Sequence, residues 1–563
     1  MSQAILTLAA WGLALFICCM IFTRTCTAIR HAAHMRGYSR TPHAVTTIPY
    51  TIPWLGHTVP FFTQSQQWLG SISRQVNRGI FAVVLGGRKC HIVMSPSLAK
   101  EVLAVQAPVN NHDMVGYFMR NVWDDKGAVA AMDQNVLWGK IHRAVYQLNR
   151  EPFLSQAGHV VTTNIERETL HLVSSQKRQI QRQQRAAVVV HGPTEFEASF
   201  FPLVRHFVAD IVLPALFGTG FMQKYPDIAA DLFQFDSSFG LFLMGLPSWM
   251  PVPGLRESAA ARDRVKRAME DLHDAISGRS GTASGYWNGV EDVSSVMKER
   301  VRLWEEATAG GSSCSKEAYI ASHAFLLWVT LINANVIVFW LLFHIYQDSS
   351  LLAAIREEVS PFIQVEDGGD TVKLNSPDIR TQTPLLQSAF LETMRLYTQS
   401  NSFKNVQADF TVTESETDQW PRESGGCLSS GSKACQNSQT VYQLQKGDII
   451  CVPFGVHQSD ARYWDCPEKF DGRRFLIPGP QAGAAGKTSV DYTRISPWGS
   501  GASLCKGQKL SSREVLEVTA AILVCWDVEP AGTTGWVHPG LARAGGTAVP
   551  KGDFRARLRR RLP

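Results

Sequence analysis

Metal-binding clusters are absent from this sequence. It contains no C-x-x-C pair, and its cysteines and histidines are nowhere grouped at the spacing of a zinc site. The 11 cysteines are odd in number and scattered, and Cys18 and Cys19 lie in an apolar segment. No disulfide framework is therefore expected, and the thiols of a body that faces the cytosol should stay reduced. Only Cys505 has unusual surroundings, because it lies in the glycine-rich stretch SPWGSGASLCKG (496–507).

Linkers and internal repeats are also lacking. No stretch rich in Gly, Ser or Pro divides the 563 residues into independent halves, and no segment recurs at a fixed period. The composition, 45% apolar and 18% charged, is that of a globular protein with a large core. We therefore expect one large domain with long loops.

A strong excess of one charge is missing as well, since the formal net charge is only +6. Basic residues cluster only in short runs such as 177–185 and 555–563, and aromatic residues do not alternate with them. This pattern indicates a solvated basic face, and no nucleic-acid partner is expected. The same surface could meet anionic lipid headgroups or an acidic protein partner.

The N-terminus carries an apolar segment, residues 4–22, that contains no charge and is about long enough to cross a bilayer as a helix. Arginines and no acidic residue follow it up to residue 40, so the positive-inside rule predicts that the flank and the body stay cytosolic. A cleaved signal peptide would instead carry its charges before the apolar run and a small-residue cleavage site after it. We predict a retained single-pass anchor at 1–23 and a basic, proline-rich hinge at 24–61.

Helical periodicity dominates the rest of the chain. Residues 97–106, 201–218 and 261–277 have apolar side chains at helical spacing. The longest apolar stretch, 318–348, is interrupted by His and Asn, which predicts a long helix through the protein core rather than a second membrane span. Short alternating runs such as 81–94 predict a small antiparallel sheet, so the expected class is mainly α.

Two polar segments, 278–289 and 413–439, are predicted to be surface insertions. Both contain Gly and Ser with few apolar residues to bury. The longer one is too polar to pack as a core element, and we expect it to be mobile.

Residues of types that can form a functional site follow one another in the C-terminal part of the chain. In AFLETMRLYTQS (389–400), Glu392 and Arg395 are three residues apart, so they share one helix face and can pair. An irregular stretch follows at 463–476, with Pro467, Phe470, Arg474 and Phe475, and the Cys505 loop comes next. A lone Glu–Arg pair is usually a surface pair, but this ordered set is more specific.

The set resembles the motifs of the cytochromes P450, which are haem-thiolate enzymes. The matching positions are Glu392-x-x-Arg395, the Pro-x-x-Phe…Arg-Phe block ending at Arg474–Phe475, and the cysteine loop with Gly501, Cys505 and Gly507. The resemblance implies the P450 fold: a large helical domain with a small antiparallel β region, here at 62–563 behind the anchor. It also implies haem b, with the Cys505 thiolate as axial ligand of the iron, a ligand that favours O–O cleavage.

The resemblance also implies roles around the haem. Glycines let the backbone pass close beneath a flat ring, and a helix that begins just after Cys505 places its positive dipole end near the thiolate. Glu392, Arg395 and Arg474 would form a buried charge network that braces the proximal side of the haem. Loss of one partner would then leave an uncompensated buried charge.

Several positions depart from the family pattern. Trp498 stands where Phe is usual, seven residues before the cysteine, and Ser503 replaces an Arg that would meet a haem propionate. Lys404 likewise stands where an Arg is expected, and a lysine is a point charge rather than a fork. We therefore expect fewer bidentate contacts to the haem.

A further propionate partner is commonly presented on a helix as Trp-x-x-x-Arg. The stretch LWGKIHRAV (137–145) offers Trp138, with His142 at the expected spacing and Arg143 one residue further. The sequence leaves open which of His142 and Arg143 meets the propionate.

The central helix departs most. Typical members carry an acid followed by Thr, which help deliver protons during oxygen activation, whereas this chain has Ile332 and Asn333 there. Asn333 is therefore the candidate catalytic residue; alternatively, Asn333 and Asn335 are polar residues satisfied within the core. The surrounding LLWVTLINANVIVFW (326–340) is similar to the branch with sterol 7α-hydroxylases and prostacyclin synthase, in which an Asn replaces the Thr.

The resemblance implies a monooxygenase that inserts oxygen into a lipophilic substrate, such as a terpenoid, sterol or polyketide. Its electrons would come from NADPH through NADPH-cytochrome P450 reductase. The apolar stretch 232–255 would roof the pocket and touch the bilayer. The anchor and the polar insertions suggest a fungal enzyme of secondary-metabolite biosynthesis in the endoplasmic reticulum membrane, with its catalytic domain in the cytosol.

Two alternatives stay open. A reductase-independent isomerase or dehydratase of the same fold would act on an oxygenated, lipid-like substrate, and Ile332 with Asn333 is the feature that suggests it. A degenerate haem-binding protein is suggested by Ser503 and Lys404.

Overall fold

The computed structural model describes residues 2–37, 45–76, 78–125, 140–173, 180–278, 289–311, 315–366, 369–418, 440–479, 488–501, 504–533, 535–542 and 546–561. These residues form two compact units. Unit 1 comprises Met1–Val115, Gln399–Pro467 and Trp498–Leu504, and unit 2 comprises Gly116–Thr398, Glu468–Pro497 and Cys505–Pro563.

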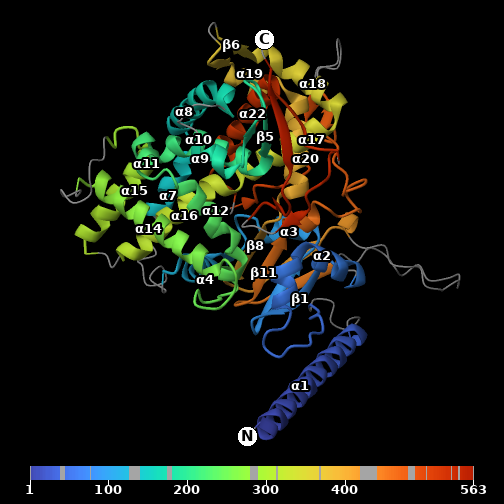
Figure 1. The fold of residues 1–563 in the computed structure, drawn as a ribbon. Helices are drawn as coiled ribbons and strands as arrows, with labels where there is room; N and C mark the ends of the chain where they lie inside the picture. The colour runs from blue at the N-terminus through green and yellow to red at the C-terminus, as the bar shows by residue number, and fades with distance from the viewer. Residues whose placement is uncertain are drawn as a thin grey trace, which may run out of the picture. The chain divides into compact units, whose positions relative to one another are not determined.

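Unit 2 is built mainly from helices (Figure 1). Its longer helices are α8 (Phe153–Glu168), α10 (Phe200–Phe217), α12 (Ile228–Ser237), α14 (Leu255–Ile276), α15 (Ser295–Ala309), α16 (Lys316–Ile332), α17 (Ala334–Gln347), α18 (Ser349–Val359), α20 (Pro384–Tyr397) and α22 (Gln508–Cys525). The shorter ones are α7 (His142–Ala144), α9 (Ile180–Arg185), α11 (Thr219–Lys224), α13 (Phe239–Leu243) and α19 (Ser376–Thr381), and α4 (His112–Trp123) precedes them in the chain.

The strands of unit 2 form one antiparallel sheet and three small hairpins. The sheet has the order β14 (Trp526–Pro530), β17 (Arg555–Arg560), β5 (Glu195–Ser199) and β4 (Val189–Val190). The hairpins pair β6 (Ile363–Val365) with β7 (Val372–Leu374), β12 (Leu476–Pro478) with β13 (Thr488–Val490), and β15 (Leu541–Ala542) with β16 (Val549–Pro550). Along β17 the buried Ala556 and Leu558 alternate with arginines, so one face of this strand packs on the core.

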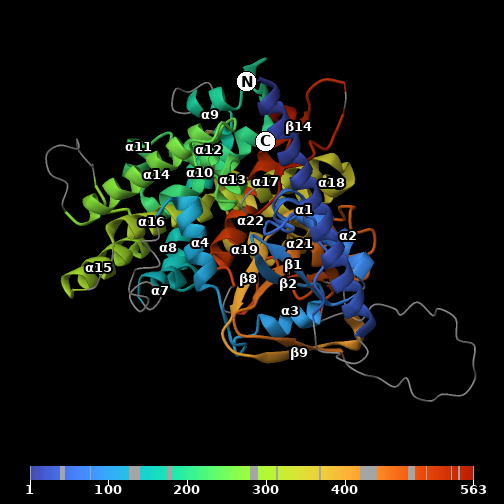
Figure 2. The same cartoon turned by 90° about the horizontal axis from the view of Figure 1, so that it is seen from below.

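Unit 1 contains a five-stranded sheet, part of which Figure 2 shows beside α3 and β9. The strand order is β1 (Ile80–Leu85), β2 (Arg88–Val93), β11 (Ile449–Pro453), β8 (Asn401–Val406) and β3 (Val109–Asn110). The helices of unit 1 are α1 (Ser2–Gly37), α2 (Thr58–Val76), α3 (Pro96–Val102) and α21 (Phe454–His457), and β9 (Phe410–Glu414) pairs with β10 (Thr440–Leu444). The predicted small β region is confirmed, but among the described strands of this sheet β2 and β11 run parallel, whereas an antiparallel sheet was predicted.

The first hairpin shows why the alternating run 81–94 folds as strands. Phe81 and Val83 on β1, like Cys90 and Ile92 on β2, are fully buried in one cluster beneath α2. The connecting Gly86 and Gly87 both have positive φ, which suits the two-residue turn of a hairpin.

The helices predicted from periodicity are present at nearly the expected places. The run 201–218 corresponds to α10, and 261–277 is the second part of α14. The run 97–106 forms a helix shorter than predicted, since α3 ends at Val102. The fold is mainly α, as predicted.

The long apolar stretch 318–348 forms two consecutive helices, α16 and α17, with Asn333 between them. The side-chain amide of Asn335 donates to the carbonyl of Leu331 at 2.5 Å, so a side chain occupies an acceptor at the end of α16. Both helices are largely buried, which confirms a core position for this stretch.

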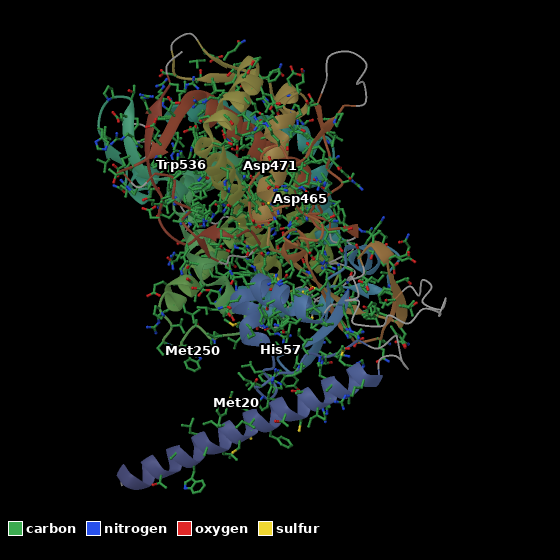
Figure 3. The ribbon with its side chains drawn as sticks, turned by 90° about the vertical axis from the view of Figure 1, so that its right-hand side faces the viewer. Met20, His57, Met250, Asp465, Asp471 and Trp536 are labelled. Carbon is green, nitrogen blue, oxygen red and sulfur yellow. The ribbon has the colours of Figure 1, made fainter. Side chains whose placement is uncertain are left out.

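Three segments are long and apolar enough to cross a membrane by length and composition: Ala10–Arg36, Phe200–Phe217 and Lys316–Gln347. Phe200–Phe217 and Lys316–Gln347 are each 78% buried within the protein, whereas none of the apolar window in Ala10–Arg36 is buried. In Figure 3 the side chains of α1 around Met20 project away from the helix axis. The N-terminal helix is therefore the candidate membrane span, and it continues through the basic flank to Gly37, within the range predicted as a hinge.

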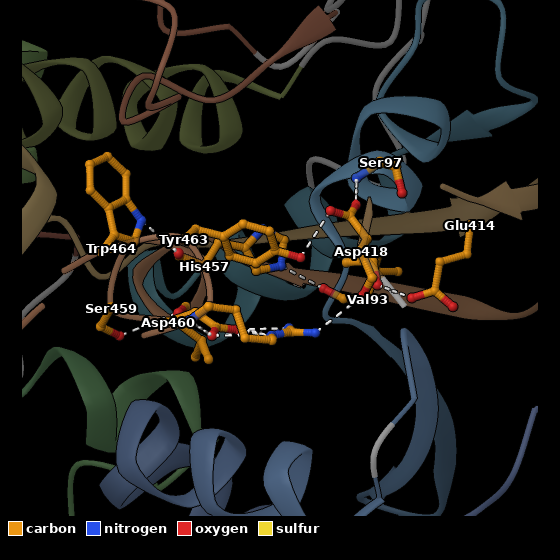
Figure 4. Close-up of polar contacts among 12 residues, drawn as sticks. Val93, Ser97, Glu414, Asp418, His457, Ser459, Asp460, Tyr463 and Trp464 are labelled. Atoms are coloured by element: carbon orange, nitrogen blue, oxygen red, sulfur yellow. Dashed lines mark hydrogen bonds and ion pairs between the residues drawn. The ribbon is translucent and has the colours of Figure 1, made fainter. Parts of the chain in front are cut away.

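A polar network in unit 1 holds the segment that enters the predicted insertion 413–439 (Figure 4). Asp418 accepts hydrogen bonds from the backbone N–H of Ser97 at 2.7 Å and from the hydroxyl of Tyr463 at 2.9 Å. Arg462 donates to the Asp418 carbonyl at 3.2 Å. Residues 419–439, like residues 279–288 of the other predicted insertion, lie outside the described residues.

Candidate active site

The loop that carries Cys505 leads directly into α22. The backbone N–H groups of Gly507 and Gln508 act on the Cys505 sulfur and lower the pKa of its thiol. Gly507 is the residue that precedes α22, so the sulfur faces the positive end of an 18-residue helix. This arrangement favours a thiolate.

Burial acts in the opposite direction. It raises the pKa of the Cys505 thiol, an effect that outweighs the two backbone donors and the nearby Lys506 cation. A metal ion bonded to the sulfur would remove the proton outright. The donor set therefore fits a thiolate that is stabilised by coordination.

Asn149 ties this loop to the start of α22. Its side-chain nitrogen donates to the carbonyl of Cys505 at 3.3 Å, and its side-chain oxygen accepts from the backbone N–H of Lys509 at 3.1 Å. One side chain thus satisfies a carbonyl before the helix and a free N–H in its first turn. Sequence reasoning missed Asn149, because no motif connects it with a cysteine so far along the chain.

The preceding part of the loop belongs to unit 1. Gly499 and Gly501 have positive φ, and a Cβ on Gly501 would lie only 1.9 Å from the carbonyl oxygen of Leu103. A side chain at position 501 is therefore excluded by both conformation and space. Trp498 is half-buried in the same segment, whereas Ser503 lies outside the described residues.

Glu392, Arg395 and Arg474 are brought together in unit 2. Arg395 donates from two nitrogens to the two oxygens of Glu392, at 2.8 and 2.9 Å. Arg474 and the backbone N–H of Asp471 donate to the same carboxylate at 3.0 and 3.1 Å. The Glu392 and Arg395 side chains have no exposed surface, so this is a buried, fully hydrogen-bonded charge cluster rather than a surface pair.

The role of the predicted propionate partners stays a prediction, and the structure gives the position of only two of them. Trp138 and the side chain of His142 lie outside the described part of the chain. Arg143 is exposed on the short helix α7 of unit 2. Lys404 is buried on β8 in unit 1.

Asn333 lies at the break between α16 and α17. Its side-chain oxygen accepts a hydrogen bond from the hydroxyl of Thr547 at 3.1 Å. A Cβ on Gly546 would come within 2.7 Å of the same oxygen, so the segment that carries Thr547 approaches Asn333 closely. Thr547 is a second contact that sequence reasoning missed.

Aromatic side chains gather on the early part of the central helix. Phe118 of α4 and Phe239 of α13 pack around Phe325 and Trp328 of α16, with Phe239 stacked on Trp328 at a centroid distance of 5.3 Å. These rings make an apolar, rigid surface of the kind that lines small-molecule sites.

A buried acid adjoins this group. Asp236 accepts a hydrogen bond from the indole nitrogen of Trp328 at 3.0 Å. Burial raises the pKa of Asp236 to about 7, and the Trp328 hydrogen bond and the Arg205 cation oppose that rise. Asp236 also escaped prediction, since it reads as an ordinary polar residue in an amphipathic helix.

Comparison with known proteins agrees with the family resemblance found in the sequence. The cytochrome P450 family profile matches residues 47–415 and 435–539, so the chain belongs to the cytochrome P450 family. It is an oxidoreductase of the P450 monooxygenase type, and membership implies a haem-thiolate iron cofactor.

Similar curated proteins come from fungi and mammals. "Cytochrome P450 monooxygenase poxD" of Penicillium oxalicum is 22% identical over 86% of this chain and 88% of its own length. "Cytochrome P450 7B1" of Mus musculus is 22% identical over 87% of this chain and 86% of its own length. "25-hydroxycholesterol 7-alpha-hydroxylase" of Rattus norvegicus is 27% identical over 37% of this chain and 46% of its own length. The predicted similarity to the sterol 7α-hydroxylase branch is confirmed.

Proposed function

We propose that this chain inserts oxygen into a lipophilic substrate of the terpenoid, sterol or polyketide class. The observation that carries the proposal is the Cys505 sulfur, which faces two backbone N–H groups at the start of α22 within a chain of the P450 family. Haem bound through this thiolate supplies the activation of dioxygen. Cys505 is the proposed axial ligand, and Gly501 and Gly507 shape its loop.

The remaining residues have supporting roles in this proposal. Glu392, Arg395 and Arg474 brace the proximal side through their buried cluster, and Asn333 takes part in oxygen activation. Trp138, one of the pair His142 and Arg143, Lys404 and Trp498 complete the proposed set of haem contacts. The aromatic group of Phe118, Phe239, Phe325 and Trp328 supports an apolar substrate, because its rings present a large apolar area and the indole N–H of Trp328 is already bonded to Asp236.

The substrate class is also supported by the relatives. One is named for the 7-alpha-hydroxylation of 25-hydroxycholesterol, and others are fungal monooxygenases. We propose secondary-metabolite biosynthesis as the setting and NADPH-cytochrome P450 reductase as the electron donor. The proposed location is the endoplasmic reticulum membrane, with residues 1–23 as anchor, 24–61 as hinge and 62–563 as the cytosolic catalytic domain.

The test has two parts. The reduced carbon monoxide complex of the purified protein should show the red-shifted Soret band of a thiolate ligand, and Cys505→Ala should lose that band while Cys466→Ala, which removes an exposed thiol, keeps it. Retention of the band in Cys505→Ala contradicts the ligand assignment.

The second part is metabolite profiling by high-resolution mass in the source organism with and without the gene. Accumulation of a lipophilic compound poorer by oxygen, or richer by two hydrogens, than the lost product supports the oxidase. A precursor and product of one formula, formed without NADPH, would instead support the isomerase or dehydratase that Ile332 and Asn333 suggest.

A further inference from the structure

At Asn333, where the resemblance to the P450 family implies a Thr, the central helix has no hydroxyl group. The nearest one on the helix, Thr330, donates to the carbonyl of Leu326 at 2.8 Å and is thus engaged with its own helix. The residues of α17 include no Ser or Thr. If a hydroxyl contributes at Asn333, another part of the chain must supply it.

Thr547 supplies such a hydroxyl. Its Oγ1 donates to Oδ1 of Asn333 at 3.1 Å, and the threonine is 3% exposed. The two residues are 214 positions apart. Since the carbonyl end of the Asn333 amide is bonded to Thr547, its NH₂ end is left to donate elsewhere.

The backbone around Thr547 is held on two sides, so its position is fixed. Thr547 forms an antiparallel bridge with Thr398, and the N–H of Ala548 donates to the carbonyl of Tyr397 at 2.9 Å. The indole nitrogen of Trp340 donates to the carbonyl of Ala548 at 2.8 Å. The segment is therefore anchored to the end of α20 and to α17.

Gly546 makes the close approach possible. A methyl group there would lie 2.7 Å from Oδ1 of Asn333, which is shorter than carbon and oxygen tolerate. A glycine at this position lets the chain pass against the Asn333 side chain.

We propose that Thr547 is a positioning residue, which holds the Asn333 amide so that it presents its N–H donors, rather than its carbonyl, to the oxygen-activation site. The inference rests on the proposed role of Asn333. With Thr547 in place, the amide can donate a hydrogen bond to a small oxygen-containing ligand or to an oxygen of the substrate. Without the hydroxyl, the amide is free to rotate and present its acceptor.

The experiment compares full-length Thr547→Val, which keeps the shape and loses the hydroxyl, with Thr547→Ser, which keeps the hydroxyl. Thr383→Val is the matched control, because Thr383 is buried and donates only to the carbonyl of Ile379 in its neighbouring helix. The first readout is the C–O stretching frequency of the reduced carbon monoxide complex, since an N–H donor close to the oxygen end of that probe lowers the frequency. The second is product formed per NADPH consumed.

We expect Thr547→Val to raise or split the stretching band and to lower the coupling roughly two- to tenfold, the range of one lost hydrogen bond. Thr547→Ser should restore both readouts, and Thr383→Val should change neither. Equal behaviour of Thr547→Val and the wild type, or equal shifts in Thr547→Val and Thr547→Ser, overturns the proposal. Thr547→Ala gives the same comparison if the valine variant does not fold.

Asn333→Ala separates this inference from the role on which it rests. If Asn333→Ala shifts the band and the coupling but Thr547→Val does not, only the positioning role of Thr547 is wrong. If Asn333→Ala changes neither readout, the proposed role of Asn333 is wrong and the inference fails with it.

Discussion

Glu392 accepts hydrogen bonds from two guanidinium groups and one backbone N–H in a place with no exposed surface. A charge in such surroundings is tolerated only while its partners remain. The cluster fixes the local structure, because its hydrogen bonds join α20 to the irregular chain around Asp471.

Glu392→Gln should destabilise the fold by about 3–5 kcal/mol, because it leaves the buried Arg395 and the partly buried Arg474 without a counter-charge. Thermal unfolding of the haem-loaded enzyme and the fraction of protein that retains haem are the measurements. Glu357→Gln is the control, since Glu357 is exposed on the nearby α18. A melting temperature within about 2 °C of wild type for Glu392→Gln contradicts the prediction.

Asp236 gives a prediction about pH. Its folded pKa of about 7 lies above that of an unfolded aspartate, so the folded state holds the extra proton between about pH 4 and 7. The contribution of Asp236 to stability is therefore present below pH 4 and is lost as the pH rises through 7.

Asp236→Asn keeps an acceptor for Trp328 and removes the titration. The melting temperature of this variant relative to wild type should rise between pH 5 and pH 7.5, as wild type loses stability. Glu257→Gln, an exposed change on α14, should show no such trend. A constant difference across the same range would show that Asp236 does not titrate there.

At the scale of elements, the start of α22 and the loop before it behave as one structure, because Asn149 bonds to both. Asn149→Asp keeps the acceptor for Lys509 and loses the donor to the Cys505 carbonyl, whereas Asn149→Ala loses both. We expect the free energy of unfolding of each variant to fall by about 0.5–1.5 kcal/mol for each hydrogen bond removed. The Soret band of the thiolate-bound haem should also be replaced faster by the band of the thiol-bound form. The measurement is the rate of this conversion in dilute urea. The rate should be highest for Asn149→Ala, intermediate for Asn149→Asp and lowest for wild type. Equal rates contradict the prediction.

The elements were largely predictable from the sequence, and the reason is that their signals are local. The runs that became α10 and α14 show apolar spacing within a single segment, and the hairpin of 81–94 shows alternation and two turn glycines. The Cys505 loop could be recognised because its glycines and cysteine lie within one short stretch of sequence. The break at Asn333 was not predicted, because an apolar helix of this length carries no local stop signal.

The site was only partly predictable for the opposite reason. Asn149, Asp236 and Thr547 act through partners 356, 92 and 214 residues away. No spacing rule connects residues at such separations, and each of the three is a common residue type in its own segment. Buried polar partners of this kind become visible only when the chain is folded.

At the scale of the whole molecule, the apolar part of the N-terminal helix contributes nothing to a core, because none of it is buried. Trp11, Leu15 and Phe22 are each more than two-thirds exposed. Hydrogen bonds to the rest of unit 1 are made further along the helix, where Arg24 donates to the carbonyl of Pro49 and Thr27 exchanges hydrogen bonds with Tyr50.

Deletion of residues 2–22, which leaves Arg24 and Thr27 in place, should therefore keep the haem-thiolate spectrum and the melting temperature. The deleted protein should move from the carbonate-resistant membrane pellet toward the soluble fraction, because the apolar span is gone. A loss of the spectrum would show that the span supports the fold.

The helix that contains this span does not end where the apolar residues end. It continues without a break to Gly37, and its last turns bond to residues 46–50 through Thr27, His31 and His34. Because α1 is continuous, a change in the tilt of its membrane-spanning part also tilts its last turns and, through their hydrogen bonds, residues 46–50. Because a helix that is too long for its bilayer tilts, a thinner membrane should change the angle at which unit 1 meets the lipid surface, so that bilayer thickness becomes a variable of enzyme orientation.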